Sequence, residues 1–350
     1  MSSVPRRAPR VLRWLIVLAI LAAAGYTAGF FAYGFVAGAP EYLSGEPRSN
    51  DCETPGSRFG WAYEPVNYVP AVGELAGAQP DASDCAAQPG TAGTDVVAPD
   101  GVHLAAWYIP RAVGLAVPTR PPGTQPTVVL VHGGKSNASG MLDYTVPLHD
   151  AYNLLIVDLR NSGRSGVTES TGGLREQGDL RAMLDWLEAT KHPTWIAVLG
   201  NSNGAATALA EARTDQRVRA LVLDSMHASL EWQLGNVIET EKGLPAWPGA
   251  LGVMVGAQFR LGESVQDVDP IRTIVQITDR PMLLTHGLAD IIDRPADSLD
   301  RNVATATAAG ITVEVYTCPG AGHGMVGKVC ASDWGGWVTT FLLANGGAGT

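Results

Sequence analysis

The chain has 350 residues, of which 46% are apolar and 17% are charged, and its formal net charge is −10. This length accommodates one large α/β domain or two small ones, and the apolar content is sufficient for a sizeable core. The acidic balance argues against nucleic acid as a partner. The Cys and His residues do not have the spacing of a zinc site, so no metal or organic cofactor is expected.

The N-terminus predicts a segment that crosses a membrane. After the arginine-rich stretch VPRRAPRVLR, an uncharged run extends from Trp14 to Ala39, and it exceeds the roughly 20 residues that span a hydrocarbon core. Arginines stay on the cytoplasmic side. We therefore expect a basic cytoplasmic tail at 1–10, a single-pass anchor at 11–39 and an extracytoplasmic remainder. The alternative is a signal peptide cleaved after LAAA, before Gly25, which would yield a secreted protein.

The four cysteines all follow this apolar segment. An even number of cysteines in an exported chain is typical of disulfides, although four cysteines allow three connectivities. Proximity in sequence favours pairing Cys52 with Cys85 and Cys318 with Cys330. Four free, partly buried thiols are the less favoured alternative.

Residues 40–93 and residues 94–345 differ in pattern. The first range is rich in Gly, Pro, Ala and Asp without a sustained helical or strand period, and it is expected to be an extracytoplasmic linker or to lie on the domain formed by the second range. In the second range, strands are expected within 94–110 (two, with a turn at 99–101), 127–134, 152–166, 194–200, 218–224, 280–287 and 311–320, and helices within 174–191, 204–214 and 333–345. This alternation predicts an α/β fold with a mainly parallel sheet covered on both faces.

An insertion at 225–270 separates two of these strands. It is long enough for two or three short helices, which would form a small lid. Its apolar residues are candidates for an acyl pocket, or they simply pack the lid onto the sheet: Trp232, Leu234, Leu244, Trp247, Leu251, Val253, Met254 and Phe259.

The pentapeptide GNSNG places Ser202 between Gly200 and Gly204. A chain this rich in Gly and Ser can match G-x-S-x-G by chance, so the motif needs its structural context. That context is present, because an apolar strand precedes Ser202 and an alanine-rich helix follows it. Such a sharp strand-to-helix turn exposes a serine hydroxyl beside a helix N-terminus, where developing negative charge is stabilised. Ser202 is therefore the predicted nucleophile.

A serine nucleophile needs a base and an acid, which follow it in the chain in this arrangement. Of the three histidines beyond Ser202, His323 lies in the Gly-rich loop after the last strand and is the predicted base. His227 and His286 directly follow or end strands and fit structural roles. For the acid we favour Asp290 over Asp293, which is expected to cap a helix or face solvent. Asp224 is a weaker alternative from an earlier strand.

The segments VLVHGG, IVDLRNSGRSG, GNSNGAA, HGLAD and GAGHG, in this order, resemble the α/β-hydrolase superfamily over about residues 94–345. The resemblance is closest to its serine-aminopeptidase-like branch, which includes small membrane-associated esterases and lipases. It implies a triad of Ser202, Asp290 and His323, and an oxyanion hole formed by the backbone N–H groups of Gly134 and Asn203. NSGRS in place of the common GHGRS, and Lys135 after the oxyanion glycine, depart from the branch without removing a catalytic atom.

The sequence thus predicts a serine hydrolase that cleaves carboxylic esters outside the cytoplasmic membrane through an acyl-enzyme. A serine peptidase of the aminopeptidase type is the nearest alternative, because Glu231, Glu239 and Glu241 could bind a substrate amine. A catalytically idle scaffold that binds an envelope partner is a third hypothesis. The complete Ser, Asp and His set argues against it.

Overall fold

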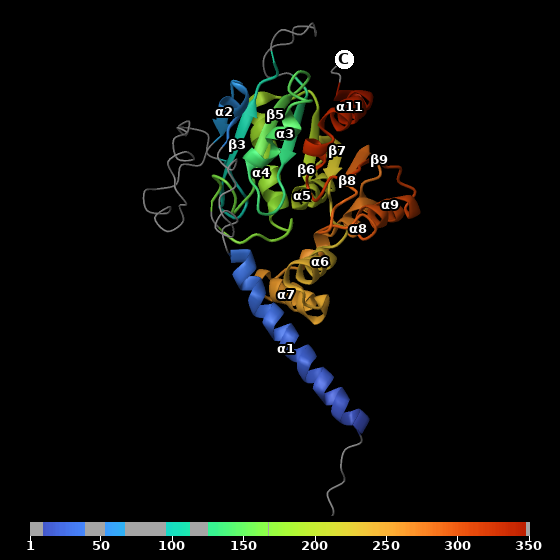
Figure 1. Ribbon diagram of the computed structural model, residues 1–350. Helices are drawn as coiled ribbons and strands as arrows, with labels where there is room; N and C mark the ends of the chain where they lie inside the picture. The colour runs from blue at the N-terminus through green and yellow to red at the C-terminus, as the bar shows by residue number, and fades with distance from the viewer. Residues whose placement is uncertain (1–9, 39–52, 67–95, 113–124, 167, 348–350) are drawn as a thin grey trace, which may run out of the picture.

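The computed structural model describes residues 10–38, 53–66, 96–112, 125–166 and 168–347, and its centre is a nine-stranded sheet (Figure 1). The spatial strand order is β1-β3-β5-β4-β6-β7-β8-β9, with β2 paired to β3. The strands are β1 Glu64–Val66, β2 Val96–Val97, β3 His103–Ile109, β4 Thr127–Val131, β5 Asn153–Asp158, β6 Ile196–Asn201, β7 Val218–Asp224, β8 Met282–Gly287 and β9 Glu314–Cys318.

The sheet is antiparallel at one edge and parallel elsewhere. Strand β3 runs antiparallel to β1, β2 and β5, whereas the pairs from β5 and β4 through to β9 are parallel. Every residue of β4, β5 and β8 is buried. Parallel strands covered on both faces need apolar side chains on both faces, which explains why these strands appear in the sequence as continuous apolar runs.

Helices cover both faces of this sheet. One buried cluster joins the sheet to α4 and α5, and a second joins its other face to α3 and α11. The helices of the chain are α1 Arg10–Gly38, α2 Pro55–Phe59, α3 Leu142–Thr145, α4 Glu176–Lys191, α5 Asn203–Ala212, α6 Leu230–Lys242, α7 Ala246–Leu261, α8 Pro270–Thr273, α9 Leu299–Ala308, α10 Val326–Val329 and α11 Ala331–Leu342, with short 3-10 turns at Ala138–Met141, Val265–Val268 and Ile274–Gln276 and a π-helical turn at Leu343–Gly347. The α/β class expected from the sequence is confirmed.

The expected linker at 40–93 contributes to the sheet. Within it, α2 begins after the Thr54 cap, whose hydroxyl accepts a hydrogen bond from the Ser57 N–H, and β1 pairs with β3 in the register Glu64 to Tyr108. A three-residue strand is too short to show a period of two, so the pattern of the sequence did not reveal it. The sheet therefore begins well before residue 94.

One of the two predicted disulfides lies within the described residues. Cys318, at the end of β9, forms a disulfide with Cys330, and their Cα atoms are 6.0 Å apart. This pairing is the predicted one. The other predicted pair, Cys52 with Cys85, lies outside the described residues.

Helix α1 leaves the domain alongside the lid (Figure 1). Its segment Val11–Phe31 is long and apolar enough to cross a membrane, which is compatible with an anchor or with a signal sequence. The insertion at 225–270 folds as α6, α7 and the turn at Val265–Val268. A small helical lid is thus present.

The apolar residues of the lid divide into two groups. Met254, with partly buried Leu234 and Val253, packs in a cluster that includes Leu174 and Ala210, so these side chains hold the lid on the domain. In contrast, Leu244, Trp247 and Phe259 are 60%, 65% and 80% exposed. Trp247, together with Trp232 and Leu251, also lines a cavity of about 240 Å³.

Candidate active site

Ser202 lies at a strained turn between β6 and α5. Its φ of 52° and ψ of −120° are a backbone conformation that non-glycine residues adopt rarely and chiefly at functional sites. The Ser202 N–H donates to the carbonyl oxygen of Asp224, 2.8 Å away, and so ties the turn to β7.

The two glycines of the motif are required by close backbone approaches. A Cβ atom on Gly200 would lie 2.4 Å from the Gly204 carbonyl oxygen, and one on Gly204 would lie 2.3 Å from the Val131 carbonyl oxygen. Only glycine fits at such distances. The small residues flanking Ser202 therefore allow α5 to pack directly on β4 and β6, as the motif predicts.

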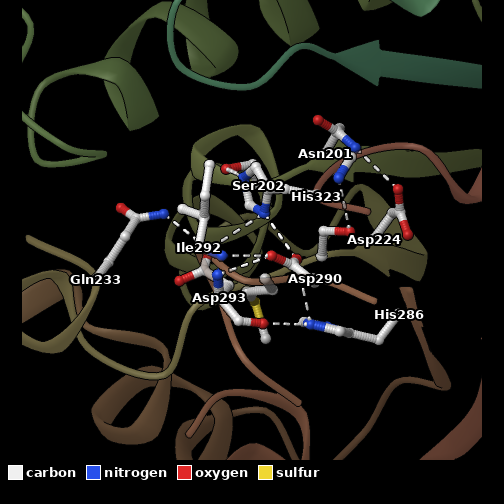
Figure 2. Close-up of polar contacts among 12 residues, drawn as sticks. Asn201, Ser202, Asp224, Gln233, His286, Asp290, Ile292, Asp293 and His323 are labelled. Atoms are coloured by element: carbon white, nitrogen blue, oxygen red, sulfur yellow. Dashed lines mark hydrogen bonds and ion pairs between the residues drawn. The ribbon is translucent and has the colours of Figure 1, made fainter. Parts of the chain in front are cut away.

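The structure brings the three predicted catalytic side chains into one hydrogen-bonded chain (Figure 2). His323 Nε2 lies 2.8 Å from Ser202 Oγ, and His323 Nδ1 lies 2.8 Å from Asp290 Oδ2. With the Nδ1 proton donated to Asp290, Nε2 is free to accept the serine proton. This is the geometry in which a histidine activates a hydroxyl and a carboxylate fixes the histidine tautomer.

Asp290 is itself fixed by its own loop. Its Oδ1 accepts hydrogen bonds from the backbone N–H groups of Ile292 and Asp293, both at 2.9 Å, and its side chain is fully buried. One carboxylate oxygen is thus held by the backbone while the other faces His323. Because the loop follows β8, it delivers the carboxylate to the carboxyl edge of the sheet, where Ser202 also lies.

The pKa of His323 results from opposing effects. Burial alone would lower it, but the hydrogen bond and charge of Asp290, together with the nearby carboxylates of Asp293 and Asp224, outweigh burial and raise the pKa above its ordinary value. A raised pKa makes the imidazole a stronger base. It also means that the imidazolium formed during proton transfer is stabilised by three carboxylates.

Asp293 is placed differently from the expectation. It neither caps a helix nor faces solvent: it is fully buried, its Oδ2 accepts from Gln233 Nε2 at 2.8 Å, and that oxygen lies 3.7 Å from His323 Nδ1 (Figure 2). Burial, opposed by the charge of His323, raises the pKa of Asp293 to about 7. The reason is that the tight backbone turn after Asp290 directs this side chain inward, beneath α6.

The two remaining histidines beyond Ser202 are both buried. His286 Nε2 lies 2.6 Å from the Asp293 carbonyl oxygen and 3.4 Å from Asp290 Oδ2, so it supports the acid loop. His227 carries a pKa lowered to about 3 by burial and by the charge of His323, and is therefore neutral. Neither contacts Ser202 in the described hydrogen bonds.

A network around Asp224 escaped the sequence reasoning. Asp224, fully buried, accepts from Thr285 Oγ1 at 2.7 Å and from Asn201 Nδ2 at 2.8 Å, and it lies 2.6 Å from the Tyr144 hydroxyl. That hydroxyl is also 3.0 Å from the carbonyl oxygen of Gly324. Asp224 thus joins the residue before the predicted nucleophile to the residue after the predicted base, and none of its described hydrogen bonds is to His323.

The predicted oxyanion residues lie next to each other beside the nucleophile. Asn203 is the first residue of α5, and a Cβ atom on Gly134 would lie 2.8 Å from Asn203 Nδ2. Gly134 and Lys135 are both exposed, so the loop after β4 is accessible at the mouth of the site.

No cluster of three or more His, Cys, Asp and Glu side chains among the described residues is arranged to hold a metal ion. The chemistry that the site offers is that of a hydroxyl, an imidazole and carboxylates.

Residues 126–276 match the family model described as the alpha/beta hydrolase fold. This match covers the nucleophile turn and the lid, and the sheet order and triad geometry agree with it. This part of the chain belongs to the α/β-hydrolase superfamily. The chain is 30% identical over 192 residues to the uncharacterised protein YqkD of Bacillus subtilis, and the matched part covers 53% of this chain and 63% of YqkD. It is also 30% identical over 207 residues to the uncharacterised protein YfhR of Salmonella typhi, and the matched part covers 55% of this chain and 62% of YfhR. It therefore spans less than two thirds of these relatives.

Solved structures share the fold of this chain. An esterase from Pyrococcus furiosus superposes with a TM-score of 0.55 at 23% identity, covering 71% of this chain and 90% of the esterase. An acylaminoacyl peptidase from Pyrococcus horikoshii superposes with a TM-score of 0.52 at 17% identity, covering 69% of this chain and 39% of the peptidase. At these identities the likeness establishes the fold alone.

Proposed function

We propose that this α/β-hydrolase is a serine hydrolase that cleaves carboxylic esters through an acyl-enzyme. The observation that carries the proposal is the continuous chain from Ser202 Oγ through the His323 ring to Asp290, with both distances at 2.8 Å. A hydroxyl is too weak an acid to attack a carbonyl unaided, and this chain supplies the base and the carboxylate that orients it.

The proposed steps follow from these positions. His323 Nε2 takes the Ser202 proton as Oγ attacks the ester carbonyl carbon, and the carbonyl oxygen becomes an oxyanion. The N–H groups of Gly134 and Asn203 stabilise that charge. The imidazolium then returns its proton to the leaving alkoxide, the C–O bond breaks, and an acyl-serine remains. Water repeats the sequence, releasing the acid and restoring Ser202.

A peptidase that releases N-terminal residues is the alternative substrate class. A cavity of about 240 Å³ between α6, α7 and the 294–301 loop is lined by Glu231 and Glu239, which suits a substrate amine. The same cavity also contains Arg294 and Arg301, so an amine would compete with two built-in cations there. Ser202, Asp290 and His323 are not among the residues that line this cavity, so its acidic side chains give no positive support for a peptidase.

The proposed location is the outer side of the cytoplasmic membrane, with α1 as an uncleaved anchor. Support comes from the apolar length of Val11–Phe31 and from the arginines that precede Trp14. The full chain should then stay with membranes after high-salt and carbonate washing. A soluble mature protein that begins near residue 25 or 40 would instead identify a signal peptide.

Labelling with a fluorophosphonate tests the nucleophile. The full chain should be labelled at Ser202, and Ser202→Ala should abolish labelling. Ser332→Ala, which removes an exposed serine on α11, is the matched control and should be labelled like the wild type. Turnover of a series of acyl esters and aminoacyl amides then separates esterase from peptidase. A wild type that is never labelled, or labelling that survives Ser202→Ala, rejects the proposal.

A further inference from the structure

Helices α1 and α7 are in backbone contact. A Cβ atom on Gly29 would lie 2.3 Å from the Gly249 carbonyl oxygen, and one on Gly252 would lie 2.4 Å from the Tyr26 carbonyl oxygen. Further along, the rings of Phe30 and Phe259 meet edge to face with centroids 6.1 Å apart. Because the two backbones approach this closely, α7 is held beside the α1 residues that it contacts, at the same level along the α1 axis (Figure 1).

Those α1 residues belong to the apolar segment itself. Gly25, whose Cβ position meets Pro248 of α7, lies six residues before Phe31, the end of the candidate span. At 1.5 Å of rise per residue, this is about 9 Å below the outer edge of the hydrocarbon region. With α1 across the membrane as proposed above, the contacting part of α7 must therefore lie within the outer leaflet.

The surface of α7 suits that environment. From Ala246 to Phe259 the helix has no charged residue, and its first charge is Arg260. Trp247 and Phe259 are 65% and 80% exposed, as is 60% of Leu244 in the turn before the helix. Aromatic and aliphatic side chains in this pattern are characteristic of helices that lie at the boundary of headgroups and acyl chains.

Helix α6 connects this surface to the catalytic residues. Gln233 Nε2 donates to Asp293 Oδ2, and Asn236 Nδ2 donates to the Ile292 carbonyl oxygen at 3.2 Å. Both acceptors lie within three residues of Asp290, the acid that faces His323. The lid is thus bonded on one side to the acid loop and packed on the other side against the anchor.

We propose that the lid, α6 with α7, is a second membrane-embedded element and that the hydrolase acts on acyl esters held in the bilayer. The lipid acyl chains cover the exposed face formed by Leu244, Trp247 and Phe259. The substrate is an amphiphile whose acyl ester reaches Ser202 from the outer leaflet alongside α6. The statement about substrate rests on the proposed esterase function, whereas the embedding of the lid does not.

The bilayer is the occupant that the geometry favours. Helix α1, on which α7 packs, itself exposes apolar side chains: Trp14, Leu18 and Phe31 are 69%, 60% and 72% exposed. A spanning helix is surrounded by lipid along its length, so a surface docked on it at the same depth meets lipid first. A second copy of this chain on the same face would make the protein dimeric in detergent.

Depth-dependent quenching tests the embedding. An environment-sensitive fluorophore is attached to Phe259→Cys and, separately, to Leu244→Cys in the full chain, under non-reducing conditions and with unsubstituted protein as the labelling blank. Val146→Cys is the matched control, because Val146 is also apolar and 53% exposed but directly follows α3 and is not part of the lid. The protein is reconstituted in phosphatidylcholine vesicles that carry a spin-labelled lipid with its nitroxide near the top of the acyl chain.

The labels at 259 and 244 should be quenched strongly and the label at 146 should not. Equal quenching at all three positions, or quenching at none, overturns the embedding. If quenching is absent and the chain elutes as a dimer in detergent, α7 is an interface between copies and the lipid proposal is wrong.

Substrate access is tested with Leu244→Asp/Phe259→Asp and the control Val146→Asp. Charges in the outer leaflet are unfavourable, so the double variant should hydrolyse a long-chain ester in vesicles at least about tenfold more slowly than the wild type, while a short-chain, water-soluble ester is hydrolysed at an unchanged rate. Loss of both activities in equal measure, or of neither, overturns access from the bilayer. A wild type that hydrolyses neither ester rejects the esterase function, and quenching still decides the embedding.

Discussion

Two buried aspartates lie beside one imidazole, and replacing each by asparagine separates their roles. Asp290 Oδ2 accepts the Nδ1 proton of His323 at 2.8 Å, whereas Asp293 Oδ2 is 3.7 Å from the same nitrogen. In Asp290→Asn, Oδ1 can still accept from the backbone N–H groups of Ile292 and Asp293, so the amide nitrogen is turned toward Nδ1. That donor favours the tautomer with its proton on Nε2, which cannot accept the proton of Ser202.

The expected loss is large for Asp290→Asn and small for Asp293→Asn. Fixing the wrong tautomer in a serine triad lowers kcat by about 10⁴, equivalent to about 5.5 kcal/mol in the transition state. Because the pKa of Asp293 is raised to about 7, only about half of this carboxyl is ionised at pH 7. Its Oδ2 also lies farther from Nδ1 than that of Asp290, so its amide should lower kcat by less than about tenfold.

The assay is ester turnover with the rate of fluorophosphonate labelling as a second measure, at pH 7, on variants whose Tm shows that they are folded. Both measures should fall together for Asp290→Asn. A fall of Asp293→Asn comparable to that of Asp290→Asn, or an Asp290→Asn variant within tenfold of the wild type, refutes the assignment of the acid.

Three further predictions concern pH, packing and the loop of the base. Turnover requires neutral His323 and should fall as pH decreases through its raised pKa; Asp293→Asn should shift this midpoint to lower pH in a kcat/KM profile. Because the folded-state pKa of Asp293 is raised to about 7, its contribution to the free energy of unfolding decreases as the pH rises from about 4 to 7. The Tm of Asp293→Asn relative to the wild type should therefore increase over that pH range and then level off. Gly204→Ala places a Cβ atom 2.3 Å from a carbonyl oxygen and should destabilise the fold by about 3 kcal/mol or more by denaturant unfolding. Gly336→Ala, at an exposed position on α11 where no atom lies within 4 Å, is the control for adding a methyl group and should cost less. Tyr144→Phe leaves Asp224 without one donor and should cost about 1–3 kcal/mol in the same measurement, with reduced turnover; an unchanged free energy of unfolding would contradict the network.

The fold could be predicted because its strands and helices have strong local patterns. The runs around Val129, Ile156 and Leu199 are apolar on both faces, which is what a covered parallel strand requires. The position of Ser202 was predictable for a related reason: Gly200 and Gly204 mark the only way in which a helix can follow a strand so closely. The order in which the acid and the base follow the nucleophile in this fold then selected Asp290 and His323, and the structure brings both beside Ser202.

What the sequence left open depends on contacts between distant segments. Tyr144 is 80 residues from Asp224 and 180 from Gly324, and no local pattern connects them. Asp293 was expected to cap a helix or to be solvated; the Gln233 side chain that donates to it comes from the lid, 60 residues earlier in the chain. The contact of Gly29 with Gly249 joins the first helix to the insertion, and two glycines separated by 220 residues predict nothing until the chain is folded.

The disulfide between Cys318 and Cys330 encloses the loop that carries His323. Closing a loop of about 13 residues contributes roughly 3 kcal/mol through the entropy of the unfolded chain. Within the native state, the same loop is held by the Gly324 N–H, which donates to Ser225 Oγ at 3.1 Å, and by the contact of the Gly324 carbonyl oxygen with Tyr144. Because a displacement of about 1 Å can cost on the order of 100-fold in rate, Cys318→Ser/Cys330→Ser should lose turnover before the domain unfolds.

Activity and circular dichroism are followed together on this variant, on Tyr144→Phe and on their combination, with non-reducing peptide maps to identify the bridge. If the two tethers hold one loop, the combined loss of turnover exceeds the sum of the separate losses on a free-energy scale. Strict additivity, or activity that declines only with the circular dichroism signal, would show that packing alone orders the loop.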